Sequence, residues 1–207
     1  MKESACLIQS ATIGSCYEQA VDYFINRHTR YCERHGWSFV VYRDAEVFGW
    51  GRISRIMAAL TAGHKYICYM DADAVISDLS IDLRDAMTGT AGGLGTVESV
   101  CPSYGVHRNV GVTYAWDLNG EATKAIEKWW KGRGGKFDVP TGYEQNVFNN
   151  LLVGEKEYQC PLLDAKWNAI INLSMVPNPV VVAAHGQGIP EYRAMLLANW
   201  LRDNGKL

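Results

Sequence analysis

The chain has 207 residues, of which 48% are hydrophobic and 20% are charged, and its formal net charge is −2. This length is typical of one domain with a substantial core. The weak negative charge excludes the basic field of a nucleic-acid-binding protein, and no apolar run approaches the ~20 residues of a membrane span. Six cysteines are scattered without a Cys-x-x-Cys pair, which predicts reduced thiols in a soluble, cytoplasmic protein.

The first third of the chain alternates between predicted strands and helices. In chain order, the expected elements are a strand at 5–10, a helix at 17–35 stopped by Gly36, a strand at 37–42, a helix at 52–60 and a strand from Lys65. Crossovers of this length join parallel strands. The order therefore predicts half of a nucleotide-binding α/β sheet.

The strand that begins at Lys65 runs into Asp71 and Asp73, which are separated by Ala72, and the apolar run then resumes to Ile76. Side chains two residues apart in an extended strand share a face, so we expect both carboxylates at the exposed carboxyl end of this strand. There α/β sheets bind ligands, and paired carboxylates attract Mg²⁺ or Mn²⁺. The alternative is an ordinary Asp-x-Asp turn after a strand.

The remaining two thirds carry less regular patterns. The expected elements are a short helix at 81–87, a glycine-rich strand at 91–97, a loop at 101–108, a strand at 109–116, helices at 121–131 and 144–152, an irregular segment at 161–172, a strand at 180–184 and a closing helix at 190–201. The basic, glycine-rich stretch at 131–136 predicts a mobile loop.

Five short motifs occur in an order that is typical of one enzyme family. They are YMDADAVI at 69–76, NVGV at 109–112, EQNVFNNLL at 144–152, KWNAI at 166–170 and VVAAHGQG at 181–188. From about Tyr17 to Gly188 the chain resembles GT-A-fold glycosyltransferases, and it is most similar to glycosyltransferase family 34, the galactosyl-, mannosyl- and xylosyltransferases.

The resemblance implies an α/β fold with one GT-A-like domain over 1–207. Its mostly parallel, Rossmann-like sheet would carry helices on both faces. A nucleotide-binding half would cover about 1–76, and a half for the acceptor and the donor sugar about 77–207. The family's usual Golgi anchor is missing here, which fits a soluble bacterial or viral relative or a fragment of a longer protein.

The implied activity is metal-dependent transfer of a hexose or pentose from a UDP- or GDP-linked nucleotide sugar to a carbohydrate or glycoconjugate acceptor. The implied cofactor is Mn²⁺ or Mg²⁺. Asp71 and Asp73 match the family's Asp-x-Asp motif, so the resemblance places them, with Ala72, at the metal, ribose and diphosphate of the donor. His185 matches a late histidine that supplies a third metal ligand, and Gly188 follows it in the donor site.

Other residues match the family's donor-binding positions. Arg52 stands where the family has lysine in a W-x-K pattern, and Arg55 lies one helical turn further on, so both cations are expected at the diphosphate. Asn109 and Gly111 stand in place of an N-S-G motif beside the donor sugar, with valine for serine between them. Asn168 matches the asparagine of K-W-N-A, which contacts donor or acceptor.

The catalytic assignments follow from an E-Q pair at a predicted helix start. The resemblance places Glu144 and Gln145 near the anomeric carbon, where a carboxylate stabilises developing positive charge. A retaining reaction assisted by the leaving phosphate needs no strong base, whereas an inverting one would use Glu144 or Asp138. The sequence leaves both stereochemical outcomes open.

Two other functions are compatible with the same sheet and aspartates. One is a nucleotide-sugar hydrolase or nucleotidyltransferase, and the other is a non-catalytic carbohydrate-binding relative. A groove lined by Trp129, Trp130 and Trp167 would favour transfer, because sugars stack on aromatic faces; otherwise these side chains belong to the core.

Overall fold

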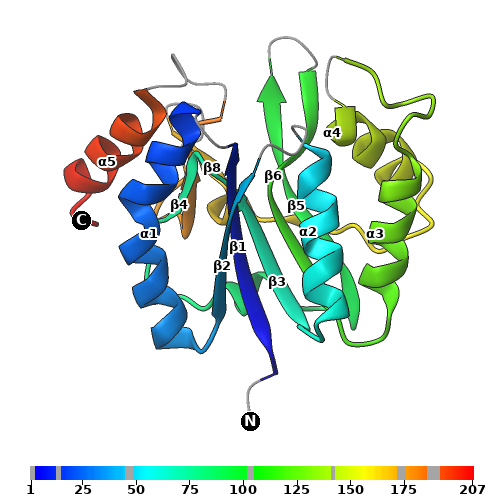
Figure 1. The fold of residues 1–207 in the computed structure, drawn as a ribbon, viewed down its shortest axis with the longest axis horizontal. Helices are drawn as coiled ribbons and strands as arrows, with labels where there is room; N and C mark the ends of the chain where they lie inside the picture. Colours follow the sequence, from blue (N-terminus) through cyan, green and yellow to red (C-terminus); the bar gives the residue numbers. More distant parts are fainter. Residues whose placement is uncertain are drawn as a thin grey trace.

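Strands and helices alternate over the first third of the chain, as predicted. The computed structural model describes residues 3–12, 15–44, 49–101, 105–140, 143–171, 176–185 and 192–207. The alternating elements are β1 (Ala5–Thr12), α1 (Cys16–His35), β2 (Ser38–Asp44), α2 (Trp50–Thr61) and β3 (Tyr66–Asp71) (Figure 1). Both β2 and β3 pair with β1 in parallel, which confirms the predicted βαβ arrangement.

Six strands form the main sheet, in the order β2-β1-β3-β6-β5-β7. The three further strands are β5 (Gly92–Cys101), β6 (Gly105–Asp117) and β7 (Leu162–Leu163). β6 is antiparallel to both β3 and β5, whereas β7 is parallel to β5. Only β6 therefore runs against the other strands, and the sheet is mostly parallel, as expected.

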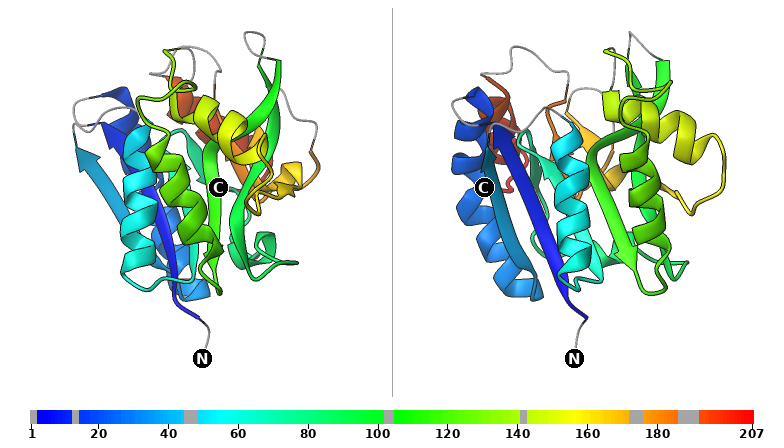
Figure 2. Two further views of the ribbon diagram at one scale, coloured as in Figure 1. Left: turned by 90° about the vertical axis from the view of Figure 1, so that its right-hand side faces the viewer. Right: turned by 45° about the vertical axis from the view of Figure 1, so that its right-hand side comes forward.

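Helices cover both faces of this sheet, because successive side chains of its central strands point to opposite sides. On one face Leu7 and Met70 pack with Tyr31 of α1. On the other, Ile8 and Ile67 pack against α2 and α3 (Glu121–Lys131). Accordingly, α1 and α5 (Arg193–Asp203) lie on one side and α2 and α3 on the other (Figure 1, Figure 2). Burial on both faces explains why the central strands are continuously apolar.

The second half of the chain contributes shorter elements. They are a 3₁₀ turn (Leu83–Ala86), α3 (Glu121–Lys131), α4 (Tyr143–Val147), a π-helical segment (Phe148–Val153), a second 3₁₀ turn (Ala165–Trp167) and α5 (Arg193–Asp203). The helix expected at 144–152 is present, but it widens into a π-helix after its first turn. The proposed division into halves at about residue 76 stays a prediction.

The run from Lys65 to Ile76 is two strands, not the single strand that was predicted. β3 ends at Asp71, the chain turns, and β4 (Ala74–Ile76) enters a second sheet. This sheet has the order β4-β9-β8, with β9 at Val181–Ala183 and β8 at Ala169–Ile170. The two aspartates therefore lie where the chain passes from one sheet to the other.

The loop predicted at 101–108 is also wrong. β5 continues to Cys101 and β6 begins at Gly105, so the two strands extend beyond β3 as a hairpin (Figure 1). Gly95 faces Tyr114 whereas Val97 faces Asn109, so two steps along β5 correspond to five along β6. The surplus residues of β6 form a bulge, which redirects side chains at the sheet's edge.

Two expectations from composition can be compared with the structure. Of the cysteines whose side chains it describes, Cys6, Cys32, Cys68 and Cys160 are free thiols. Burial raises the pKa of Cys6 to about 11, so this thiol is unreactive at neutral pH. Within the described ranges, no helix combines the length and the apolar character that crossing a membrane requires.

Candidate functional site

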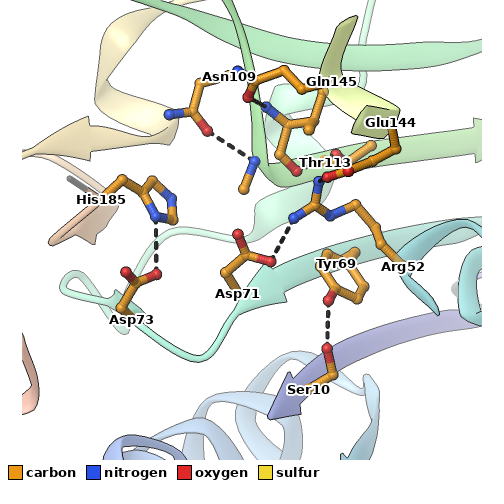
Figure 3. Close-up of polar contacts among 12 residues, drawn as sticks. Ser10, Arg52, Tyr69, Asp71, Asp73, Asn109, Thr113, Glu144, Gln145 and His185 are labelled. Carbon is orange, nitrogen blue, oxygen red and sulfur yellow. Dashed lines mark hydrogen bonds and ion pairs between the residues drawn. The ribbon is translucent and has the colours of Figure 1, made fainter. Parts of the chain in front are cut away.

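Polar side chains from separate segments meet at the carboxyl ends of β1 and β3 (Figure 3). They come from β1 (Ser10), α2 (Arg52), β3 (Asp71), the following turn (Asp73), β6 (Asn109), α4 (Glu144) and the segment that follows β9 (His185). Because parallel strands end together at this edge, sequence positions that are far apart converge here.

Asp71, Asp73 and His185 form the centre of the site. One ligand atom from each lies within 4.8 Å of the others. Asp73 Oδ1 lies 2.9 Å from His185 Nδ1, and Arg193 Nη1 donates to Asp73 Oδ2 at 2.7 Å. Asp73 is only 4% exposed, so the expectation of two exposed carboxylates is wrong for this residue.

The charge state of this centre follows from its pairs. Burial raises the pKa of Asp73, but the charge and hydrogen bond of His185, followed by those of Arg193, outweigh it and lower the pKa to about 2. Burial lowers the pKa of His185, whereas Asp73 raises it, and the net change is upward. Asp73 is therefore a buried carboxylate that is charged at neutral pH.

The residues present fit a divalent cation. His185 Nε2 is buried and has no hydrogen-bond partner among the residues that the structure describes. It faces Gly111, where an added Cβ would overlap the imidazole, so the absence of a side chain at this position leaves room for the ring. Two carboxylates and one imidazole are ligand types that metals such as Mn²⁺ accept.

Arg52 links the centre to α4. Its Nη2 donates to Asp71 Oδ1 at 2.7 Å and its Nη1 donates to Glu144 Oε1 at 2.8 Å. The guanidinium is buried and lies over the ring of Tyr69, whose hydroxyl pairs with Ser10. Burial lowers the pKa of Arg52, but Asp71 and Glu144 outweigh it, so the group stays charged.

Glu144 lies on the far side of Arg52 from Asp71 (Figure 3). It is 7% exposed, and burial raises the pKa of its carboxyl although Arg52 opposes this change. A Cβ at Gly49 would overlap the carboxylate, so the start of α2 packs directly on Glu144. Its backbone oxygen accepts a bond from Trp129 Nε1 at 2.8 Å. Glu144 is thus fixed against Arg52.

The bulge of β6 supplies amides to the same site. Asn109 Oδ1 accepts bonds from Gly111 N at 2.8 Å and from Asn168 Nδ2 at 3.4 Å. Asn168 Oδ1 is buried and has no partner in the described part of the chain. Gln145 Oε1 accepts from Val110 N at 3.4 Å, which ties α4 to the bulge. Asn168 is therefore the amide with a free acceptor.

Three other predicted donor positions are not among the polar side chains that meet at the site. Arg55 is buried and stacks on the ring of Tyr42 at 5.1 Å, beside Arg52 along α2. Ala72 is buried and packs against Ala11. Gly188 lies outside the described residues.

Asp138, the alternative base, is engaged in loop contacts. Its Oδ1 accepts from Trp50 Nε1 at 3.3 Å and its Oδ2 accepts from Gly134 N at 2.7 Å. These bonds, together with those from Gly135 N to Gly132 O and from Asp138 N to Gly135 O, hold the basic segment in a compact turn. They favour a structural role for Asp138.

Of the three tryptophans that could have lined an acceptor groove, two are buried. Trp129 is fully buried and packs on Phe148, and Trp167 is 5% exposed and packs on Tyr114. Both belong to the core. Trp130 is half-buried and lies against Trp50.

Arg193 is the site residue that sequence reasoning missed. It begins α5, and besides Asp73 it contacts Tyr17, whose hydroxyl accepts a bond at 3.0 Å. One signal was available, because a helix N-terminus disfavours a cation unless an anion lies nearby.

Comparison with known proteins rests on the fold. No protein-family model matches the chain, and no curated protein matches it in sequence. A solved structure of a glycosyltransferase involved in the glycosylation of the major capsid of PBCV-1 matches with a TM-score of 0.73 and 16% identity. The match covers 95% of this chain and 99% of that one.

Two further glycosyltransferases match less closely. The apo form of GlyE from Streptococcus pneumoniae TIGR4 has a TM-score of 0.58 and 12% identity over 100% of this chain, which spans 65% of GlyE. The apo form of mouse xyloside xylosyltransferase 1 has a TM-score of 0.55 and 9% identity, over 90% of this chain and 100% of that one. The chain therefore has the GT-A-like α/β fold of these glycosyltransferases. At such identities this likeness establishes the fold, and the activity must be argued from the site.

Proposed function

We propose that this protein is a metal-dependent glycosyltransferase that moves a sugar from a UDP- or GDP-linked donor to a carbohydrate or glycoconjugate acceptor. The carrying observation is the convergence of Asp71, Asp73 and His185 at the strand ends of a GT-A-like fold. Arg52 and Arg193 flank this cluster, so carboxylates and cations are both at hand for a metal-bound diphosphate.

Asp71, Asp73 and His185 would hold the divalent cation. When bound, the cation neutralises the negative charge that grows on the leaving diphosphate. Imidazole is a better ligand for Mn²⁺ than for Mg²⁺, which prefers oxygen, so the set favours Mn²⁺. The role of His185 as a ligand is supported by its Nε2, which has no hydrogen-bond partner among the residues described.

Arg52 and Arg193 would bind the phosphates. Each donates one terminal nitrogen to a carboxylate of the cluster, and a guanidinium has further donors for phosphate oxygens. Arg55, one turn along α2, would extend the basic surface toward the nucleotide. Such fixed cations act where charge grows in the transition state.

Asn109 of the bulge and Asn168 would line the position of the sugar, whereas Ala72 and Gly188 would lie nearer the metal-bound part of the donor. Asn168 offers a buried oxygen, without a partner among the described residues, that can accept a bond from a hydroxyl. Asn109 holds the backbone of Gly111 and the side chain of Asn168 in place. This arrangement is suited to a hydroxyl-rich ligand, because a lost bond to a buried polar group is costly.

Glu144 is better suited to positioning Arg52 than to touching the sugar. Its carboxylate is buried against the guanidinium, Gln145 is bonded to the bulge, and Asp138 to a loop. Both carboxylates, Glu144 and Asp138, are thus engaged in hydrogen bonds, and Gln145 is an amide that cannot act as a base. This arrangement supports assistance by the leaving phosphate over general-base catalysis.

The test is a thermal-shift screen of UDP- and GDP-sugars with Mn²⁺, with Mg²⁺ and with a chelator. A ligand that binds the folded state raises the melting temperature by mass action. The winning donor is then incubated with glycan acceptors, and glycosylated product and free sugar are quantified separately. We expect a shift only with metal, and product in excess of free sugar.

Asp71→Asn should lose the shift, whereas the matched control Asp82→Asn, at the opposite end of the strands, should keep it. Metal-independent shifts would contradict the proposed metal role. Free sugar without glycosylated product would favour a hydrolase.

A further inference from the structure

Gln9, on β1, is fully buried directly beneath the turn that carries the two aspartates. Its Nε2 donates to the backbone oxygen of Asp71 at 3.3 Å and to that of Ala74 at 3.1 Å. These two carbonyls bracket the turn, one at the end of β3 and the other at the start of β4. A single amide group therefore spans both ends of the turn.

His28, on α1, is also fully buried and completes this contact. Its Nδ1 lies 3.0 Å from Gln9 Oε1, and its Nε2 accepts a bond from Ile76 N at 3.3 Å. Because Nε2 is the acceptor, Nδ1 carries the proton and donates to Gln9. The chain of bonds thus runs from β4 through α1 to β1 and back to the turn.

The pair has no other evident use. Burying an amide and an imidazole costs free energy unless each polar atom is bonded, and here both nitrogens of the ring and both atoms of the amide are. Burial, followed by the charge of Arg27, lowers the pKa of His28 to about 3, so the ring is neutral and its bonding pattern constant. Fully satisfied buried networks impose a unique geometry.

The turn needs such a support. Asp71 and Asp73 carry like charges a few ångströms apart, and repulsion between them favours opening of the turn. On its other side, Asp73 O accepts from Ala184 N at 2.9 Å, which joins the turn to the segment that carries His185. The backbone of the turn is therefore held from β1 on one side and from β9 on the other.

We propose that Gln9 and His28 are positioning residues that hold the Asp71–Asp73 turn in its metal-binding geometry. This inference rests on the proposed function, because it assigns to the pair the preorganisation of that metal site. Neither side chain reaches the ligand atoms themselves; both act through the backbone of the turn.

The first measurement is the affinity for Mn²⁺ alone, from the electron paramagnetic resonance signal of free Mn²⁺. Gln9→Met keeps the side chain's length but removes both donors, and we expect affinity to fall about tenfold or more, as for other residues that orient metal ligands. The matched control is Tyr31→Phe, which removes a buried bond from Leu83 N at the opposite end of the sheet. This control should lose stability but keep the wild-type affinity.

His28 supplies a second, independent pair of variants. His28→Asn keeps an amide donor near the position of Nδ1, whereas His28→Leu keeps none. We expect His28→Leu to weaken Mn²⁺ binding and His28→Asn to restore much of it. The double variant Gln9→Met/His28→Leu should lose no more affinity than Gln9→Met, because residues that act as one unit are not additive.

The outcomes separate the inference from the proposed function. If Asp71→Asn binds Mn²⁺ as well as wild type, the metal site itself is wrong. If Asp71→Asn loses the metal but Gln9→Met and His28→Leu bind as tightly as Tyr31→Phe, only the positioning role is overturned. The wild-type protein supplies a check that needs no folded variant. Nitrogen NMR should find His28 protonated on Nδ1, and a proton on Nε2 would overturn the inference.

Discussion

Two clusters of charged side chains lie at opposite ends of the parallel strands. In the amino-end cluster, Asp82 accepts bonds from Trp37 Nε1 at 3.0 Å and from Arg84 Nη1 at 2.7 Å. Arg84 also donates to the backbone oxygens of His35 and Gly36 and lies over the ring of Trp37. This cluster joins the end of α1 to the first 3₁₀ turn and satisfies its charges locally.

The site cluster at the carboxyl ends has the same kinds of ion pair, but it differs in whether its histidine is fully hydrogen-bonded. The histidines show the contrast: His35 Nε2 donates to Leu79 O at 3.0 Å, whereas His185 Nε2 has no partner within the described ranges. Within the described part of the chain, Nε of Arg52 and Nε of Arg84 both lack a hydrogen-bond partner, so this feature does not distinguish the two clusters. An imidazole nitrogen without a partner among the described residues, on a ring beside two carboxylates, is what indicates a ligand site.

The largest difference between the two clusters is expected when one aspartate in each is neutralised. Asp73→Asn removes a charge from the site centre, and we expect Mn²⁺ binding to be lost and transfer to fall by about a hundredfold or more, since a bound metal supplies several kcal/mol. Asp82→Asn should leave both unchanged and lower only stability. Metal titration and initial rates measure the effect.

Equal losses of Mn²⁺ binding in the two variants would mean that the clusters do not differ in function. Because Asp73 is buried between His185 and Arg193, its variant must also be shown to be folded, by circular dichroism and by its unfolding midpoint.

A smaller difference between the two ends of the sheet is expected from one glycine substitution at each end. Gly111→Ala would place a Cβ against the imidazole of His185, so we expect Mn²⁺ affinity to fall about tenfold through displacement of this ligand. Gly36→Ala meets no atom within 4 Å but strains the positive φ that ends α1, so it should cost about 1 kcal/mol of stability and leave metal binding unchanged. Isothermal titration and urea unfolding separate the two effects.

A Gly111→Ala variant that binds Mn²⁺ like wild type would remove His185 Nε2 from the ligand set. It would leave Asp71 and Asp73 in place.

Much of this architecture could be predicted from the sequence because it depends on local patterns. Buried parallel strands are apolar on both faces, and their ends share one edge, so Asp71 and His185 could be expected to meet. The change of sheet after Asp71 could not be predicted, because β3 and β4 are both buried and give one continuous apolar run. Nothing in a run of buried residues reports which sheet each belongs to.

Polar contacts between residues far apart in the chain also could not be predicted from the sequence. Arg193 reaches Asp73 across 120 positions, and Gln9 and His28 support a turn that lies more than 40 positions away from either. In the sequence, Gln9 lies at the polar end of a short predicted strand, and His28 is one polar residue within a predicted helix. Their importance follows from burial with complete hydrogen bonding, which only the assembled structure shows.

Acid unfolding tests whether both clusters hold their carboxylates in the charged form. Asp73 has a pKa of about 2, below its ordinary value near 3.9, so its contribution to stability is full above about pH 4 and is lost as the pH falls toward 2. A shift of this size corresponds to about 2–3 kcal/mol. Asp82 acts in the same direction: burial raises its pKa, but bonds from Arg84 and Trp37 outweigh it.

When the pH is lowered from 5 to 2.5, the free energy of unfolding should therefore decrease less in Asp73→Asn than in wild type. The same is expected for Asp82→Asn. An unchanged acid loss in Asp73→Asn would show that His185 and Arg193 do not stabilise its charge.

The smallest effect is expected for Asp138, which the sequence offered as an alternative base. Its two oxygens accept from Trp50 and Gly134, so Asp138→Asn keeps one of the two acceptors, replaces the other by an amide donor and removes a charge from a loop. We expect turnover and the Michaelis constant for donor to change less than about twofold, and the melting temperature to fall by a few degrees.

A base that takes a proton in the transition state would behave differently, because its loss costs a factor of about 10²–10⁴ in turnover. A drop of that size, with donor affinity intact, would return Asp138 to the reacting centre and favour an inverting reaction. A small change in both constants would support a structural role for Asp138, whose oxygens join the loop after α3 to Trp50 at the start of α2.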